Sequence, residues 1–315
     1  VCLWETEKAH PTAIHHAGSV RTVRFSPKGE WVASGSRDET VWIRDVTNGE
    51  RVLRLVGHDG GVQRVAFAPD PSKRLLSVAT DGTARVWDLA AGRIERVVQA
   101  HDVPISTCAY SADGAFFFTG ARDHLTKVWD AKTFECVRTL AGHEHWVRSM
   151  AVHPDGRLIT GGYDGTLVTW VPETGRRVSR CERHTKPDGS PAPVTGVGFL
   201  PDGNIAVSGG LGGTLRFWNV VTGDLVHQVQ AHSEGIVDVF VHEGFVLSAG
   251  MDRHVKWWRF SEDGTEVTLV HSLLFPVELD SIAAFGSRVA VGDRAGHIHF
   301  LGTFKEPLRL DHKVR

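Results

Sequence analysis

The sequence predicts an all-β protein built from seven similar repeats. Related segments recur along the chain, among them "TDGTARVWD" from Thr80, "RDHLTKVWD" from Arg122 and "YDGTLVTWV" from Tyr163. The positions equivalent to the aspartate of these segments are 38, 81, 123, 164, 212, 252 and 295, so neighbouring positions are 40 to 48 residues apart. A period of about 40 to 45 residues is typical of a β-propeller with one four-stranded blade per repeat.

Each repeat is predicted to form four antiparallel strands. Segments such as "VRTVRFSPKGEWVASGS" from Val20 and "VRSMAVHPDGRLITGG" from Val147 contain alternating or short apolar runs that are broken by turn-forming Pro, Asp and Gly. No segment has a convincing helical period. We expect a single domain over residues 1–315, with repeats at approximately 15–56, 57–99, 100–140, 141–182, 183–230, 231–270 and 271–304.

Composition and charge exclude several classes of function. The 315 residues are 41% hydrophobic, and 35 basic against 37 acidic side chains leave a net charge of −2, so the whole chain has no electrostatic reason to bind nucleic acid or an anionic membrane. No apolar run approaches the roughly 18 residues of a membrane-spanning helix. The four cysteines form no C-x-x-C pair, which predicts neither a disulfide framework nor a cysteine zinc site. We therefore expect a protein of the cytoplasm.

A Gly-His or Ala-His start, a turn aspartate and a Trp-Asp end recur in register. The histidines of these starts are His58, His101, His143 and His232, and Trp-Asp pairs stand at 87–88 and 129–130. At these residues the sequence resembles the WD-repeat family of β-propellers, and the resemblance covers nearly the whole chain.

The resemblance implies that a histidine, a Ser or Thr, the turn aspartate and a tryptophan form a buried hydrogen-bonded tetrad in a blade. By matched position the tetrads are His58, Ser77, Asp81 and Trp87; His101, Thr119, Asp123 and Trp129; His143, Thr160, Asp164 and Trp170; and His232, Ser248, Asp252 and Trp258. A buried polar group without a partner costs roughly 1–3 kcal/mol. Since the same set recurs in four repeats, we interpret it as structural and not as catalytic or metal-binding.

Three repeats depart from this pattern. The first has Arg44 where the tryptophan is expected, although Trp42 stands two residues earlier. The fifth has Gly212 in place of the aspartate, and the seventh has Ala295 and Leu301 and no matching histidine. We predict incomplete tetrads in these three blades.

The seventh repeat is also predicted to be short of one strand. Its segments "DSIAAF", "RVAVGD" and "HIHFLG" supply three strands. The resemblance implies that the missing outer strand comes from Lys8–Ile14, so that an N-terminal strand closes the ring. Val1–Trp4 also resembles a third strand, which leaves open a partial eighth blade.

Searches for catalytic and metal-binding motifs find no strong candidate. The sequence contains no G-x-x-x-x-G-K-[ST], H-E-x-x-H or G-x-S-x-G motif. The glycine-rich Gly209–Gly213 lies in a predicted turn with no helix after it to bind phosphate. The pairs His15-His16 and His297-x-His299 could coordinate a metal, but we interpret them as structural or solvated. We expect no catalytic residue, metal or cofactor.

The resemblance implies that a ligand is held on the narrower top face of the ring, around the central channel. Residues at the start of each inner strand and just before the turn aspartate would contact it. Arginine and large aromatic residues are enriched in binding hot spots. The predicted partner-binding residues are Arg21, Arg37, Arg122, Trp146, Arg148 and Tyr163. The segment Thr185–Pro193 lengthens the fifth repeat on the same face and is either a rim of the site or a tolerated insertion.

These features favour a non-catalytic scaffold or sensing module that binds a peptide or protein partner, acidic or phosphorylated, on its top face. The chain resembles the bacterial WD-repeat arrays attached to NACHT-type ATPases, kinases or caspase-like proteases, which implies one domain of a larger intracellular signalling protein. Two alternatives are a nucleic-acid-binding propeller, which would show a steep salt dependence, and a propeller enzyme with an acid or histidine at the channel mouth.

Overall fold

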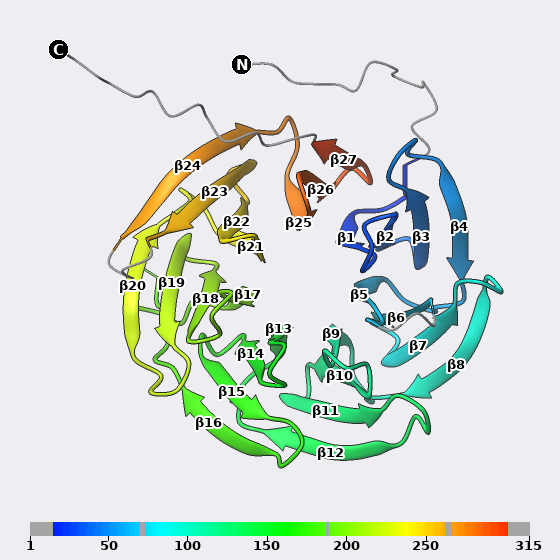
Figure 1. Ribbon diagram of the computed structural model, residues 1–315, viewed down its shortest axis with the longest axis horizontal. Coiled ribbons are helices and arrows are strands. Elements are labelled where there is room, and N and C mark those ends of the chain that lie inside the picture. The colour runs from blue at the N-terminus through cyan, green and yellow to red at the C-terminus, as the bar shows by residue number, and fades with distance from the viewer. Residues whose placement is uncertain (1–14, 70–72, 187–188, 262–265, 302–315) are drawn as a thin grey trace.

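The computed structural model describes residues 15–69, 73–186, 189–261 and 266–301. These residues form 27 strands in seven antiparallel sheets arranged as a ring around a central channel (Figure 1). The described part of the chain contains no helix, and hence none that could cross a membrane. The predicted all-β, seven-bladed propeller is confirmed.

The first three blades each contain four strands. Blade one consists of β1 (Val20–Phe25), β2 (Trp31–Ser36), β3 (Thr40–Asp45) and β4 (Arg51–Val56). Blade two consists of β5 (Val62–Phe67), β6 (Arg74–Ala79), β7 (Thr83–Asp88) and β8 (Arg93–Gln99). Blade three consists of β9 (Ile105–Tyr110), β10 (Phe116–Ala121), β11 (Leu125–Asp130) and β12 (Cys136–Ala141).

The next three blades repeat this order. Blade four consists of β13 (Val147–Val152), β14 (Leu158–Gly162), β15 (Leu167–Val171) and β16 (Arg176–Arg180). Blade five consists of β17 (Val194–Phe199), β18 (Ile205–Gly210), β19 (Thr214–Asn219) and β20 (Leu225–Gln230). Blade six consists of β21 (Ile236–His242), β22 (Phe245–Gly250), β23 (His254–Phe260) and β24 (Val267–Leu274).

Blade seven has three strands among the described residues, β25 (Leu279–Phe285), β26 (Arg288–Asp293) and β27 (Ile298–Leu301). β25 lies beside β1, where the Ser281 hydroxyl donates to the Val20 carbonyl at 3.4 Å. Blade seven therefore packs against blade one. The predicted closing strand at Lys8–Ile14 and the strand-like Val1–Trp4 lie outside the described residues, so closure by an N-terminal strand stays a prediction.

The hydrophobic core is divided among the contacts between neighbouring blades. Ile43 and Leu55 of blade one pack with Leu75 and Trp87 of blade two, and all four are buried. The outermost strands are mostly exposed, whereas the second strand of each blade is almost completely buried. Each blade thus buries its faces against the blades on either side, which is why a closed ring is needed.

Because neighbouring strands are antiparallel, the turns of each blade lie on two opposite faces of the ring. Turns between the second and third strands lie on the same face as the loops that lead into each first strand, and we call this the top face. The first strands β1, β5, β9, β13, β17, β21 and β25 surround the channel (Figure 1). Side chains at the top of these strands therefore meet at the channel mouth.

Candidate functional site

Four blades contain the complete hydrogen-bonded tetrad. In blade two, His58 Nδ1 donates to the Asp81 carboxylate at 2.9 Å, its Nε2 lies 2.7 Å from Ser77 Oγ, and Trp87 Nε1 donates to the same oxygen at 2.8 Å. The structure brings together the matching residues of blades three, four and six by the same contacts. Every polar atom of these imidazoles is used within the blade, so none is free to act on a substrate.

Blade one contains three members of a tetrad, and the sequence interpretation missed its histidine. His16 Nδ1 lies 2.9 Å from Asp38, and its Nε2 lies 2.9 Å from Ser34 Oγ. The pair His15-His16 was considered for metal binding, but His16 is the tetrad histidine, 22 residues before Asp38 just as His101 is 22 residues before its aspartate. The predicted gap at Arg44 is present: the Trp42 ring instead stacks on His16 at 4.2 Å.

Blade five contains a tetrad that lacks its carboxylate. His184 Nε2 lies 2.6 Å from Ser208 Oγ, and Trp218 Nε1 donates to that oxygen at 2.7 Å. His184 is fully buried, and its Nδ1 has no hydrogen-bond partner because Gly212 stands where the aspartate would be. His184 was missed because the insertion Thr185–Pro193 changes its spacing to the rest of the repeat.

Protonation of His184 is expected to destabilise the fold in acid. Burial and repulsion by Arg216 lower its pKa to about 3, against an ordinary value near 6.5. The unfolded chain therefore binds the proton more tightly, and stability is lost as the pH falls from about 6.5 towards 3. Urea unfolding at several pH values should show a smaller loss in Gly212→Asp, whose carboxylate would pair with the imidazolium. Parallel stability curves for the two proteins would contradict this assignment.

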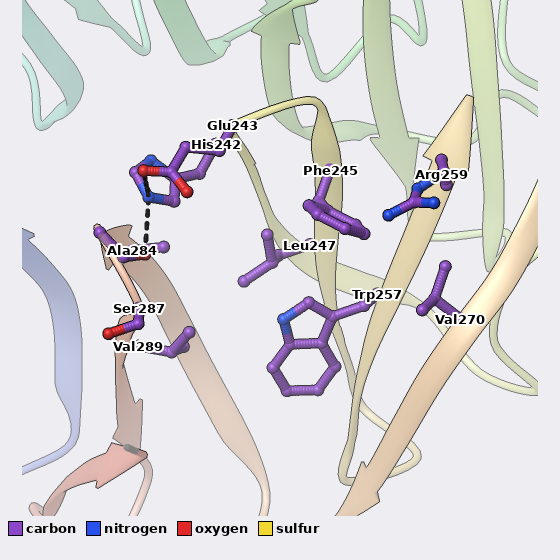
Figure 2. Close-up of a pocket in the computed structure, with 11 residues that line it drawn as sticks. His242, Glu243, Phe245, Leu247, Trp257, Arg259, Val270, Ala284, Ser287 and Val289 are labelled. Carbon is purple, nitrogen blue, oxygen red and sulfur yellow. Dashed lines mark hydrogen bonds and ion pairs between the residues drawn. The ribbon is translucent and has the colours of Figure 1, made fainter. Parts of the chain in front are cut away.

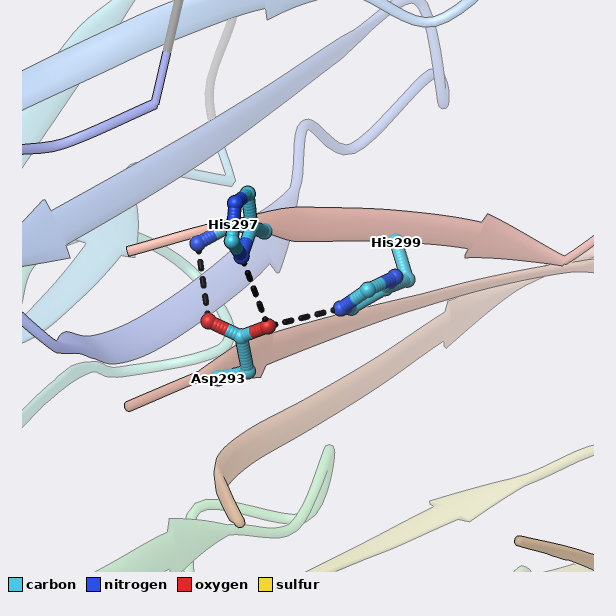
Figure 3. A group of neighbouring side chains, drawn as sticks. All are labelled: Asp293, His297 and His299. Carbon is cyan, nitrogen blue, oxygen red and sulfur yellow. Dashed lines mark hydrogen bonds and ion pairs between the residues drawn. The ribbon is translucent and has the colours of Figure 1, made fainter. Parts of the chain in front are cut away.

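Blade seven replaces the tetrad by a different group of polar side chains. His299 Nε2 and His297 Nδ1 lie 2.8 and 3.1 Å from the same oxygen of Asp293, whose side chain is fully buried (Figure 3). These three residues could hold a metal ion, since one ligand atom of each lies within 4.8 Å of the others. Each of these two nitrogens already contacts the carboxylate, so we interpret the group as a structural substitute. That no metal binds stays a prediction.

The channel contains a buried ion pair between blades two and six. Arg64 Nη1 and Nη2 donate to the two oxygens of Asp238 at 3.0 and 2.9 Å, and Arg24 approaches the same carboxylate at 3.7 Å. Burial by itself would raise the pKa of Asp238, but the attraction of Arg64 and Arg24 holds it below its usual value. The sequence interpretation did not identify either partner.

A β-bulge lies at the top of each inner strand, close to the channel mouth. The pairing register shifts by one residue there in all seven blades, which leaves the bulged residue unpaired and changes its direction. The bulged residues are Arg21, Gln63, Ser106, Arg148, Thr195, Val237 and Asp280. Arg21 and Arg148 of the predicted site therefore lie at equivalent positions.

Arginines outnumber acids around the channel. Arg21 pairs with Asp280 at 3.3 Å, whereas Arg148 makes no ion pair within 4.0 Å in the part of the chain that the structure describes. Burial and repulsion by Arg64 lower the pKa of Arg148 to about 10, so it stays protonated at neutral pH. Among the described residues, the channel arginines Arg21, Arg24, Arg64 and Arg148 lie near two aspartates, Asp238 and Asp280, and Asp280 also pairs with Arg294 at 3.3 Å.

Three other predicted residues meet where blades three and four adjoin. The Arg122 guanidinium lies over the Trp146 ring at 4.3 Å, and the Tyr163 ring lies 5.2 Å from Trp146. His145 stands beside both aromatic rings at 5.0 and 5.1 Å. We call these four residues the Trp146 cluster. The remaining predicted residue, Arg37, is exposed on blade one and belongs to a different part of the rim.

An apolar pocket that the sequence did not predict lies between blades six and seven, at the turns of the face opposite the top. It encloses about 120 Å³ (Figure 2). Its wall includes Phe245, Leu247 and Trp257, and His242 at one edge hydrogen-bonds to the Gly286 carbonyl at 2.9 Å. The acid of its lining, Glu243, pairs with His242 at 3.5 Å. We therefore interpret the pocket as an apolar surface and not as a catalytic site.

Comparison with known proteins assigns the chain to a family. The family model described as "WD domain, G-beta repeat" matches residues 9–45, 49–88, 92–130, 134–170, 178–219 and 223–259. The chain is 31% identical over 238 residues to apoptotic protease-activating factor 1 of Rattus norvegicus, covering 74% of this chain and 19% of that protein.

Two further relatives match different shares of the chain. Nuclear distribution protein PAC1 of Arthroderma benhamiae is 34% identical over 203 residues, which cover 53% of this chain and 44% of that protein. The guanine nucleotide-binding protein subunit beta of Oryza sativa subsp. japonica is 28% identical over 278 residues, which cover 81% and 73%. The chain thus spans less than half of the first two relatives. With six matched repeats on a seven-bladed ring, the chain belongs to the WD40 repeat family of β-propellers.

Proposed function

We propose that the chain is a non-catalytic interaction module that holds an acidic peptide segment of a partner protein at the channel mouth, beside blades three and four. The observation that carries this proposal is the Trp146 cluster next to an arginine, Arg148, that has no ion-pair partner among the described residues. Arginine offers two parallel hydrogen bonds to a carboxylate or phosphate, and the flat rings offer apolar contact.

The charges of the channel support an acidic ligand and do not favour catalysis. The arginine excess attracts an anion, while the two channel aspartates are engaged by arginines at 2.9 to 3.3 Å. A carboxyl group that acts as a general acid or base must be able to exchange a proton near neutral pH. Arginine neighbours favour the ionised form of Asp238, which makes it unsuited to that role. The proposed ligand carries its negative charge on carboxylate or phosphate groups.

The names of the relatives agree with action through other proteins. One is a protease-activating factor, and another is a subunit of a guanine nucleotide-binding protein. Since the rat relative is several times longer than this chain, the proposal includes a place within a longer signalling protein of the cytoplasm.

Trp146→Ala and Arg148→Ala are each expected to weaken peptide binding by about 2 kcal/mol, or roughly 30-fold, as for central hot-spot residues. Trp146→Ala removes the ring on which Arg122 stacks, and Arg148→Ala removes the unpaired guanidinium. Peptides selected from a displayed library on the wild-type protein should be enriched in Asp, Glu or phosphoserine. Their affinities for the variants can be measured by fluorescence polarisation.

Lys186→Ala is the matched control, because Lys186 is an exposed charge on the same face at the rim of blade five. It should change the affinity by less than threefold, since exposed charges at the edge of an interface are well screened. All variants should keep the wild-type melting temperature. Full affinity in a Trp146/Arg148 double variant would contradict the proposal, and preferential capture of oligonucleotides with a steep salt dependence would favour nucleic-acid binding.

A further inference from the structure

Blade two shows how a complete tetrad holds its carboxylate. The Asp81 oxygens accept hydrogen bonds from His58 Nδ1 at 2.9 Å and from Thr83 N and Oγ1, both at 2.8 Å. The Arg85 guanidinium lies 3.8 Å away and adds a positive charge. An imidazole, a hydroxyl and a guanidinium thus surround one carboxylate, with a backbone N–H of Asp59 donating at 3.0 Å.

Blade five keeps these three side chains and lacks the carboxylate. His184, Thr214 and Arg216 occupy the positions equivalent to those in blade two, and Gly212 replaces the aspartate. His184 Nδ1, Thr214 Oγ1 and Arg216 Nε are all buried without a hydrogen-bond partner. Only seven buried side-chain atoms in the described residues lack a partner, so three in one blade mark a specific place. An orphaned buried polar group is costly, and His184 Nδ1 and Thr214 Oγ1 are equivalent to the blade-two atoms that donate to the Asp81 carboxylate.

Position 212 can accept the first atom of a side chain and lies on the top face. A Cβ atom on Gly212 would lie 3.4 Å from the Thr185 carbonyl oxygen and 3.6 Å from Ala192 Cβ, which are ordinary contact distances. Gly212 is partly exposed. Aspartates at the same position in other blades keep exposed side-chain fractions of 4 to 25%, as in Asp164 and Asp123. Residue 212 therefore lies near the surface, and the three polar atoms without partners lie buried beneath it.

We propose that blade five binds a carboxylate group of another molecule in the place of the missing aspartate. His184 and Thr214 would donate to its oxygens, and Arg216 would supply the opposite charge. Arg216 Nη1 already donates to the Arg183 carbonyl at 2.8 Å and Glu182 attracts the guanidinium, but its Nε has no acceptor. A planar carboxylate matches the arrangement in blade two, whereas a tetrahedral phosphate or sulfate has no counterpart in any blade. This site is separate from the Trp146 cluster and does not depend on its proposed function.

Sodium formate is the probe, with sodium chloride at the same ionic strength as the reference. Saturating formate should raise the melting temperature of the wild-type protein by about 2 °C or more. Gly212→Asp should raise it without formate and abolish the formate response, because its own carboxylate fills the position. Gly212→Ala is the matched control: it adds only a Cβ that fits, so the response to formate should persist.

A readout at the site separates binding from general salt effects. In nitrogen-15 spectra, formate should shift the His184 Nδ1 signal to that of a hydrogen-bonded N–H, and Gly212→Asp should show this signal without formate. Equal formate responses in the wild-type protein and Gly212→Asp, or no shift at His184, would overturn the proposal. Trp146→Ala should respond like the wild type, which keeps this test independent of peptide binding at the Trp146 cluster.

The source of the carboxylate can be identified with a second probe, N-acetyl-aspartate N-methylamide, which mimics an aspartate within a polypeptide. Binding at least tenfold tighter than that of formate would indicate an acidic side chain of a partner protein. Binding of formate with exclusion of the capped aspartate would indicate a small carboxylate. Both outcomes support a carboxylate site, and failure of both probes to bind would overturn it.

Discussion

Asp238→Asn is expected to lower the free energy of unfolding by about 3–5 kcal/mol. The Asp238 and Arg64 side chains are only 1% and 6% exposed, and two hydrogen bonds of 2.9 and 3.0 Å join them. Asparagine preserves the volume but removes the charge that Arg64 and Arg24 require. The variant thus leaves the buried Arg64 guanidinium and the partly exposed Arg24 guanidinium without this counter-charge, which costs more than a lost surface pair. Urea unfolding followed by tryptophan fluorescence measures the difference.

Glu95→Gln is the matched control for this experiment. Glu95 also pairs with an arginine, Arg74, but both side chains are nearly 30% exposed, so the loss should be below about 1 kcal/mol. Because the pKa of Asp238 is held below its usual value, its contribution is complete above about pH 4 and is lost as the pH falls below that value. Equal stability losses in the two variants would show that the channel pair does not join blades two and six energetically.

Asp164→Ala is expected to lower the free energy of unfolding by about 2–4 kcal/mol. The Asp164 carboxylate accepts hydrogen bonds from Glu144 N at 2.7 Å and from Thr166 N and Oγ1 at 2.9 and 2.7 Å, with His143 Nδ1 at 3.3 Å. Alanine would leave these donors without an acceptor inside blade four. Differential scanning calorimetry should show a lower melting temperature with the secondary structure preserved.

Asp155→Ala provides the comparison, because the Asp155 side chain is 42% exposed and pairs with Arg157 at the surface. Its loss should be about 1 kcal/mol or less. Burial would raise the pKa of Asp164, but the hydrogen bonds and charge of His143 hold it below its usual value, so the stabilisation is present above about pH 4 and declines in stronger acid. A variant that kept its melting temperature while a catalytic activity disappeared would refute the structural role of Asp164.

The sequence alone was sufficient for the number of blades and for the tetrad contacts within four of them. A tetrad lies within about 30 residues of chain, so the spacing between His58 and Trp87 predicts one blade without knowledge of the others. The sequence also predicted three of the four residues of the Trp146 cluster, since Arg122 and Tyr163 come from adjacent repeats at matched positions, but it did not predict His145. Where an insertion or an unusual spacing interrupted the repeat, as at His184, the same reasoning failed.

Contacts between distant blades were decided only by the tertiary structure. Arg64 and Asp238 are 174 residues apart, and no local pattern pairs them, because their meeting depends on the diameter and closure of the ring. The same holds for Arg21 and Asp280, 259 residues apart, which meet because blade seven returns to blade one. Whether Arg148 is paired also depends on this geometry. Repeat spacing determines which residues form a blade. The pairing of charges in the channel depends instead on Coulomb attraction and desolvation, and both depend on distances in space and not on separation along the sequence.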